Sequence, residues 1–421
     1  MQSNVERNEL REEIRAVVRR RASEVVRIAL ELVSLTTETP PGNTSEIARS
    51  VKAILSEGAG IHVETVQTSE TVANVLAKVT GNGPGRRLVF NGHLDTFPIG
   101  NIAEWTANPQ GEVRDNRLYG LGISDMKGGV AAALFALRVI ADFRAHFAGE
   151  LVGTFVGDEE TLGSLGTKYL LDNFESARGD AMISGDMGTP QVLRFGEKGM
   201  IWLKLSAKGK SAHAAHVHKG VSAIEKIISV MEEMKGLRSL RPAAPKEVMN
   251  AIQKSRPVSE KYSGQGETEV LGSITVTFGT IRGGRLPNLV ADHAEVTVDI
   301  RLPVGATVDD ILGRIEKIVE AHQDVTLTVS GCHEPTWTDP GHDVIKTVAE
   351  ACRETMGVDP VVNMRIGASD ARLYRATGIP SVVCGLTPYN VGAADEHVDL
   401  NELKALAEIF TLSAFDYLTS S

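Results

Sequence analysis

Cysteine is scarce in this chain of 421 residues. The three cysteines, Cys332, Cys352 and Cys384, are widely spaced, and no two of them form a C-x-x-C pair. An odd number without paired spacing excludes a disulfide framework and a cysteine-based zinc ribbon. We interpret all three as buried thiols in a reducing compartment.

Long apolar runs and an excess of basic residues are also missing. No stretch approaches the roughly 18 apolar residues of a membrane span, and the first 21 residues are charged throughout, unlike the apolar core of a signal peptide. Lys and Arg number 44 against 54 Asp and Glu, a net charge of −10. This balance disfavours nucleic acid or a membrane surface as a partner. We therefore expect a soluble cytoplasmic protein.

The first half of the chain alternates helix-like and strand-like segments. Apolar residues recur at helical spacing within residues 9–35 and again within 126–143. A further helix, with Ser45 as its N-cap, is expected through Ile54, and short apolar strands are expected at 87–91, 150–156 and 181–184. This alternation predicts an α/β fold with a mainly parallel sheet flanked by helices.

The pattern changes near Gly196. Strands are expected at 199–208, 273–280, 294–301 and 325–329, with helices at 221–234 and 308–321. Two helices on one antiparallel sheet make a ferredoxin-like α+β domain. The polar stretch 237–272, which contains three prolines, is expected to be a long loop or an insertion. Because the first pattern returns after residue 331, we expect one domain of residues 1–195 and 332–421 and an inserted domain of 196–331.

Histidine or carboxylate side chains follow four of the expected strands or turns. These residues are His93 and Asp95, Asp125, the run Asp158, Glu159 and Glu160, and Asp186. Each alone has an ordinary structural explanation, such as a helix-capping Asp or a solvated loop. Ligands of open α/β sheets, however, bind beyond the carboxyl ends of the strands. An imidazole with several carboxylates suits zinc, manganese or cobalt, and a nearby unligated Glu suits a general base.

Seven segments together resemble one enzyme family. They are NGHLDT, LYGLGISDMKGG, GDEETLGSLG, SGDMGTP, KGKSAHAAHVHKGVSAI, FGTIRGGRLPNLV and GASDARLYRATGIPSVVCG. The chain resembles the co-catalytic metallopeptidase and aminoacylase family, which includes succinyl-diaminopimelate desuccinylase, acetylornithine deacetylase and glutamate carboxypeptidase. The segments run in the family's order and extend the resemblance over about residues 25–415.

The resemblance implies a site for one or two divalent transition metals per chain, zinc, manganese or cobalt. His93 and Asp186 would hold one metal, Asp125 would bridge to a second, and Glu160 would bind that second one. Asp95 would orient His93. Glu159 would be the general base, which takes a proton from water and passes it to the leaving nitrogen.

The resemblance gives the inserted domain the role of a lid and dimerisation domain, so a homodimer or higher homo-oligomer is expected. His213 would complete the oxyanion site. Asn288 and Arg301 would help to hold the substrate, commonly through its carboxylate, for which the Arg fork is suited. Each of these residues also has a purely structural interpretation.

Two departures from the family pattern concern histidines. The family's last metal-binding His falls on Gly392 here, and the nearest imidazole is His397. We interpret His397 as a replacement ligand, with a surface histidine as the alternative. In the lid motif, His216 and His218 are additional. We take His216 as a substrate contact, with simple solvent exposure as the alternative.

The sequence thus predicts a metal-dependent hydrolase of a carbon–nitrogen bond in a small carboxylate-bearing substrate, an N-acyl amino acid or a peptide. One alternative is an aminohydrolase that releases ammonia from an activated aromatic amine such as a nitroanthranilate. Another is a non-catalytic binding protein that has lost a metal site.

Overall fold

The structure is a computed structural model that describes residues 4–420, and the chain divides into two compact units. The first unit runs to residue 196 and resumes at 338–363 and from 369 onward, and the second comprises 197–337 and 364–368. The sequence placed the second boundary at residue 331. Strand β12 (Val325–His333) continues past that position, because its pairing with β9 extends to His333.

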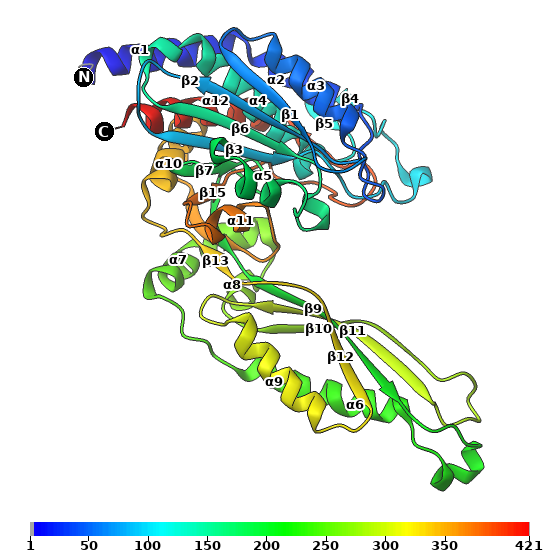
Figure 1. Ribbon diagram of the computed structural model, residues 1–421. Coiled ribbons are helices and arrows are strands. Elements are labelled where there is room, and N and C mark those ends of the chain that lie inside the picture. Colours follow the sequence, from blue (N-terminus) through cyan, green and yellow to red (C-terminus); the bar gives the residue numbers. More distant parts are fainter. Residues whose placement is uncertain (1–3, 421) are drawn as a thin grey trace. The chain divides into compact units, whose positions relative to one another are not determined.

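The first unit is built on a sheet with the strand order β1-β2-β6-β3-β7-β15-β8 (Figure 1). The strands are β1 (Ile61–Gln67), β2 (Ala73–Thr80), β3 (Arg87–His93), β6 (Glu150–Val156), β7 (Ala181–Ser184), β8 (Val192–Glu197) and β15 (Ser381–Val383). The four central strands, β6, β3, β7 and β15, pair in parallel. The outer strands are antiparallel to their neighbours. The predicted α/β fold with a mainly parallel centre is confirmed.

Helices cover both faces of this sheet. The long helices of the unit are α1 (Asn4–Arg20), α2 (Ala22–Val33), α3 (Ser45–Ser56), α4 (Gly128–Asp142), α10 (Asp343–Met356) and α12 (Leu400–Thr419). Because side chains alternate along a strand, Phe90 of β3 stacks on Phe410 of α12 with ring centroids 5.1 Å apart, whereas Val89 joins the apolar cluster of the other face with Tyr374 of α11 (Ala371–Ala376).

The second unit has the strand and helix order of a ferredoxin-like domain. Its main elements are β9 (Gly199–Lys208), α6 (Ala223–Met234), β10 (Thr275–Gly283), β11 (His293–Leu302), α9 (Val308–Glu320) and β12 (Figure 1). All pairs in the sheet order β10-β11-β9-β12 are antiparallel. Ile227 of α6 and Ile315 of α9 are fully buried in one core with Leu205 and Val296 of the sheet. The expected α+β insertion is therefore present.

The expectation of a long loop at residues 237–272 is wrong. Helices α7 (Lys246–Ser263) and α8 (Glu267–Leu271) occupy most of this stretch. Val248, Ile252, Ser255 and Ser259 are buried at helical spacing, but two of the four are serines, so the apolar periodicity is weak. Pro257 lies inside α7, where a proline normally argues against a helix.

Two smaller expectations from the sequence are also corrected. Cys352 and Cys384 are buried, with their sulfur atoms 3.9 Å apart, but Cys332 is exposed. Ser45 is the first residue of α3 and not its cap, and its N–H donates to the side chain of Asn43.

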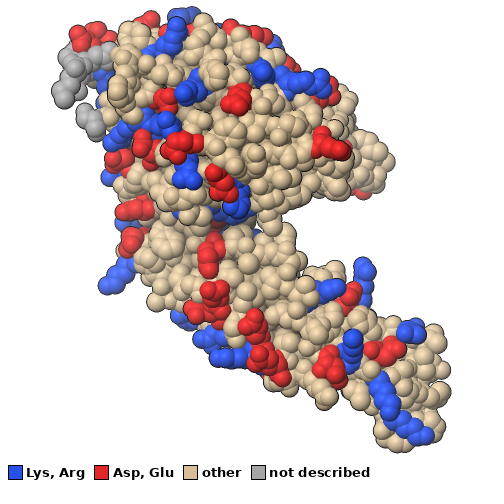
Figure 2. Space-filling model, in the orientation of Figure 1, with Lys and Arg blue, Asp and Glu red and all other residues tan. Residues whose placement is uncertain are grey.

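The surface carries charged side chains of both signs. Acidic and basic side chains are intermixed on the face of the molecule shown in Figure 2. In the part of the chain from residue 4 to residue 420, no helix combines the length and the apolar character that crossing a membrane requires.

Candidate active site

The expected site residues lie where the central strands of the first unit end. His93 is the last residue of β3, Asp186 comes two residues after β7, and a short turn of helix after β6 carries Glu159 and Glu160. Asp125 lies in a turn, Ile123–Lys127, directly before α4. Because β3, β6 and β7 are parallel, their carboxyl ends meet at one edge of the sheet, where ligands of open α/β sheets bind.

Two groups of metal-type ligands form at this edge. Single ligand atoms of His93, Asp125 and Asp186 all lie within 4.8 Å of one another, and those of His93, Glu159 and Glu160 do so as well. His93 Nε2 is 3.2 Å from Asp125 Oδ1. The structure therefore brings together five side chains that the sequence placed at strand ends or turns. His93 belongs to both groups and so links them into one cluster.

Asp95 supports this cluster in a way the sequence did not show. His93 Nδ1 is 2.9 Å from the backbone carbonyl oxygen of Asp95 and 3.6 Å from its carboxylate. The carboxylate instead accepts the backbone N–H groups of Glu159 at 3.2 Å and of Glu160 at 3.0 Å. Asp95 is fully buried. It thus fixes both the histidine ring and the acidic turn.

Burial and charge crowding shift the pKa values of the cluster. Burial raises the pKa of Glu160 to about 8, and although the charge on His93 opposes the shift, Asp125 adds to it. Burial likewise raises the pKa of Glu159 well above its usual range. Burial alone would lower the pKa of His93, but hydrogen bonds to Asp125 and Asp95 outweigh it and raise that pKa. The cluster holds more negative charge than its protein partners neutralise.

A divalent metal fits this arrangement. Glu160 Oε1 is buried and has no hydrogen-bond partner among residues 4–420, and buried polar atoms are ordinarily paired. A divalent cation would relieve the repulsion among the carboxylates. One imidazole with several carboxylate oxygens is a donor set for zinc, manganese or cobalt.

Three supporting residues were not assigned roles from the sequence. Glu396 is buried, and its carboxylate accepts the backbone N–H groups of Gly122 and Ser124, each at 2.9 Å, which fixes the turn that presents Asp125. Arg372 NH1 lies 3.6 Å from Glu159 Oε1. Burial has the largest effect on the pKa of Glu159 and raises it. The charge on His93 opposes this shift, and the charge on Asp370 adds to it. Asp370 and Arg372 belong to the quoted segment GASDARLYRATGIPSVVCG, so a signal for them was present.

His397 lies outside both ligand groups. Its ring stacks on Tyr389 with centroids 5.0 Å apart and contacts the tilted ring of Tyr119 at 4.8 Å, and its Nδ1 is 2.8 Å from the carbonyl oxygen of Asp395. It begins strand β16 (His397–Asp399), which pairs with β5 (Arg117–Tyr119). Glu396, the residue before β16, is buried and contacts the turn of Asp125 instead. The geometry does not support His397 as a replacement ligand.

The second unit carries the remaining expected residues. His213 is exposed, and its Nδ1 accepts the backbone N–H of Ala215 at 3.1 Å. The carbonyl of Asn288 accepts the N–H of Ala214 at 2.9 Å, so Asn288 is beside His213. The ring of His216 has its centroid 6.2 Å from that of His213.

Arg301 is placed differently from the expectation of a free carboxylate-binding fork. Its Nε donates to Asp299 Oδ1 and its NH2 to Asp299 Oδ2, both at 2.9 Å. Asp299 is two residues earlier on the same strand, β11. The fork is therefore already occupied by a carboxylate of its own unit.

A buried histidine–carboxylate cluster at the carboxyl edge of a parallel sheet, with a glutamate beside it, defines a metal-dependent hydrolase. Comparison with known sequences agrees. The profile of peptidase family M20/M25/M40 matches residues 89–415, and the chain belongs to this family. It is accordingly a metallohydrolase that acts on carbon–nitrogen amide bonds.

Individual relatives cover nearly the whole chain. A succinyl-diaminopimelate desuccinylase of Cereibacter sphaeroides is 29% identical over 383 residues, 87% of this chain and 92% of that protein. The M20 family metallo-carboxypeptidase Sso-CP2 from Sulfolobus solfataricus has a TM-score of 0.80 at 18% identity, covering 94% of this chain and 99% of the other. The Bacillus subtilis YXEP protein, a dinuclear metal-binding peptidase, has a TM-score of 0.66 at 14% identity, covering 94% and 98%. These structures share the fold.

Proposed function

We propose that this protein hydrolyses the amide bond of a small N-acyl amino acid or peptide that carries a carboxylate. The observation that carries the proposal is the pair of ligand groups that share His93, one with Asp125 and Asp186 and the other with Glu159 and Glu160. His93 and Asp186 would hold one metal, Glu160 a second, and Asp125 both. When bound, a divalent metal acidifies water and polarises the amide carbonyl.

Glu159 is proposed as the general base. It takes a proton from the attacking water and returns it to the leaving nitrogen. Its environment suits this task, because burial raises its pKa well above the usual range and so makes the carboxylate a stronger proton acceptor. The guanidinium of Arg372, 3.6 Å away, keeps the carboxylate form accessible.

His213 is proposed to stabilise the oxyanion by closure of the second unit, as a lid. Since Nδ1 of His213 accepts a hydrogen bond from Ala215, the proton of the neutral ring resides on Nε2. That N–H is then a donor that could serve an oxyanion. Asn288 and His216 would contact the substrate from the same loop region. Arg301 would do so only through the terminal nitrogen that Asp299 does not engage.

The decisive experiment is a substrate panel with added zinc, manganese or cobalt. N-succinyl-diaminopimelate, N-acetyl amino acids and dipeptides are assayed for release of the free amine, and a nitroanthranilate is assayed for ammonia. The proposal expects amine release that is lost in Glu159→Gln. Ammonia release alone would establish the aminohydrolase alternative. No release from any compound with any metal would favour a non-catalytic binding protein.

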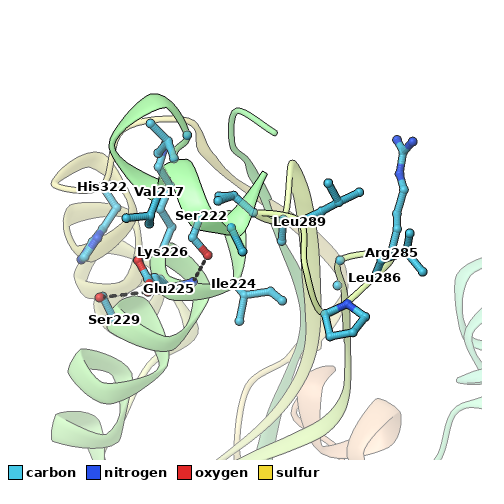
Figure 3. A pocket seen from close by; sticks show the side chains of 18 residues that line it. Val217, Ser222, Ile224, Glu225, Lys226, Ser229, Arg285, Leu286, Leu289 and His322 are labelled. Atoms are coloured by element: carbon cyan, nitrogen blue, oxygen red, sulfur yellow. Dashed lines mark hydrogen bonds between the residues drawn. The ribbon is translucent and has the colours of Figure 1, made fainter. Parts of the chain in front are cut away.

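We further propose that the second unit forms a homodimer with a second copy of this chain. A groove of about 930 Å³ lies between the turn Ala214–Lys219 and α6 on one side and the β10–β11 connection on the other. Val217 and Leu286, labelled in Figure 3, line it. Val217 is 66% and Leu286 59% exposed. Apolar side chains of this exposure, gathered in one place, mark an association site.

Strand β10 strengthens this proposal because it is an edge of its sheet. Its residues from Gly279 to Gly283 are exposed, including Ile281 at 55%. An exposed apolar edge strand pairs readily with another chain, and a two-fold axis lets the same strand serve both subunits.

The mass in solution tests the dimer directly. Light scattering after gel filtration should show a dimer for the native chain and a monomer for Ile281→Asp. The matched control is Val113→Asp, which changes a residue of similar exposure, 46%, in the first unit and should remain dimeric. A monomeric native chain would contradict the proposal.

A further inference from the structure

The loop that carries Glu159 and Glu160 contains an uncommon backbone conformation. It connects β6 to α5 (Thr167–Asn173), and its short turn Glu159–Thr161 ends at Leu162 with a φ of +76°. A side chain with a Cβ is disfavoured in this left-handed region, and such a residue persists where its surroundings hold it there. Contacts with neighbouring segments must therefore keep this loop in place.

Arg372 of α11 contacts the loop at Leu162. The residue is 3% exposed, and its NH2 donates to the carbonyl oxygen of Leu162 at 2.8 Å. Its NH1 donates to the carbonyl oxygen of Ser369 at 2.8 Å and lies 3.6 Å from Glu159 Oε1. A guanidinium is planar and rigid, so this single group links the end of the turn, the Glu159 carboxylate and the segment before α11.

Asp370 contacts the same loop at a second point. Its Oδ2 accepts the hydroxyl of Thr167, the residue directly after the loop, at 2.7 Å, and both side chains are buried. A Cβ added to Gly163 would lie 2.6 Å from Asp370 Oδ1, so the loop packs directly on this carboxylate. Residues 369–372 thus hold the loop at both Leu162 and Thr167.

From these contacts we infer that Arg372 is a positioning residue that sets the Glu159 carboxylate for proton transfer. It acts through Glu159 and the Leu162 backbone and does not touch the substrate. The step that depends on it is transfer of the water proton to Glu159, which a base displaced by about 1 Å performs on the order of 10²-fold more slowly. The inference rests on the proposed role of Glu159 as the base.

Steady-state kinetics of Arg372→Met give the first test. The assay uses saturating manganese and the compound of the substrate panel that releases amine fastest. We expect kcat to fall on the order of 10- to 100-fold while KM changes by less than about twofold, because positioning of the base matters in the transition state and not in substrate binding. An unchanged kcat would overturn the inference.

Two further variants accompany this measurement. Arg178→Met is the matched control, since Arg178 Nε also donates to a backbone carbonyl, that of Leu171 at 3.0 Å, but precedes the amino end of β7. It should keep native kcat. Gly163→Ala, at a φ of +69°, pushes the loop away from Asp370 while Arg372 stays intact. Its kcat should also fall, which tests the contact even if Arg372→Met does not fold.

A double variant separates positioning from general loss of structure. If Arg372 acts through Glu159, adding Arg372→Met to Glu159→Gln should cost less than about twofold further in kcat. Multiplication of the two losses would overturn the inference, because Arg372 would then act independently of the base. Near-native activity of Glu159→Gln alone would instead refute the proposed base.

Hydrogen exchange of the metal-loaded protein tests the contact without a substrate. The N–H of Leu162 donates to Glu159 at 2.8 Å and that of Gly163 to Asp158 at 2.9 Å. In Arg372→Met these amides, followed in peptides within residues 157–166, should exchange at least about tenfold faster, with α12 unchanged. Native exchange rates in this loop would overturn the inference even if no compound of the panel is hydrolysed.

Discussion

Replacement of Glu159 by Gln separates a catalytic base from a metal ligand. The substitution keeps the size and shape of the side chain and removes its ability to accept a proton. The Glu159 side chain is 12% exposed and lies among charged groups, with His93 and Glu160 in the same ligand group and Arg372 NH1 at 3.6 Å. The neutral amide can occupy the same space, so we expect the fold to be retained.

The expected loss of turnover follows from the role of a general base. Such groups contribute ~10²–10⁴-fold to rate, which corresponds to about 3–5 kcal/mol of transition-state stabilisation at 1.36 kcal/mol per decade. The metal content should not change, because the other cluster carboxylates, Asp125, Glu160 and Asp186, remain.

The stability of the metal-free variant gives an independent check with a definite sign. Burial raises the folded-state pKa of Glu159 above the unfolded value of 4.5. As pH rises above about 4.5, the unfolded chain releases this proton first, so the native chain loses stability with rising pH. Gln at position 159 removes that contribution. Metal-free Glu159→Gln should therefore melt at a higher temperature than the metal-free native chain at pH 7 to 8.

The assay pairs amine release with elemental analysis of the purified protein. Glu160→Gln is the control, since it changes the adjacent carboxylate and should lower metal content. Activity of Glu159→Gln within a few fold of the native chain would refute Glu159 as the base. Loss of metal in Glu159→Gln with full metal in Glu160→Gln would exchange their roles.

Three further substitutions test the parts that support the cluster. Asp95→Asn turns one acceptor of a backbone N–H into a donor, so calorimetry should show a loss of about 1.5–3 kcal/mol and turnover should fall; an unchanged melting temperature would contradict this. Gly129→Ala places a Cβ 2.1 Å from the carbonyl oxygen of Gly185, next to Asp186. We therefore expect a loss of about 1–3 kcal/mol in the free energy of unfolding and weaker metal retention. Gly313→Ala, with open space around the new Cβ, is the control and should show neither effect. His397→Phe keeps the stacking on two tyrosines and should leave metal content unchanged; a loss of metal would restore His397 as a ligand.

The fold followed from the sequence where apolar periodicity is strong. The strands around Val89, Val152 and Met182 and the helix α4 are almost wholly apolar and bounded by turns, and the structure has them. Helix α7 was missed because its buried stripe includes Ser255 and Ser259 and because Pro257 interrupts it. Tertiary packing decides whether such a segment forms a helix, and the local sequence pattern does not record that packing.

The site followed from the sequence as far as strand ends determine it. His93 ends β3, and Glu159 and Asp186 follow β6 and β7 within three residues, so their proximity is a consequence of the parallel topology. Glu396 acts on a turn 274 residues earlier in the chain, and sequence spacing gives no measure of that contact. His397 lies outside both ligand groups, and its position depends on the pairing of β16 with β5, which the local sequence does not record.

The interrupted course of the first unit has a consequence for biosynthesis. Strand β15 lies between β7 and β8 in the sheet, and α12 covers β3 through Phe410, yet both are made only after the second unit. At the rate of ribosomal synthesis, α12 is completed on the order of tens of seconds after the apolar helix α4 that it covers. The nascent first unit must be kept from aggregating during that interval. A chain that stops after residue 368 would contain the whole second unit, joined to a first unit whose sheet lacks β15 and whose helix α12 is missing.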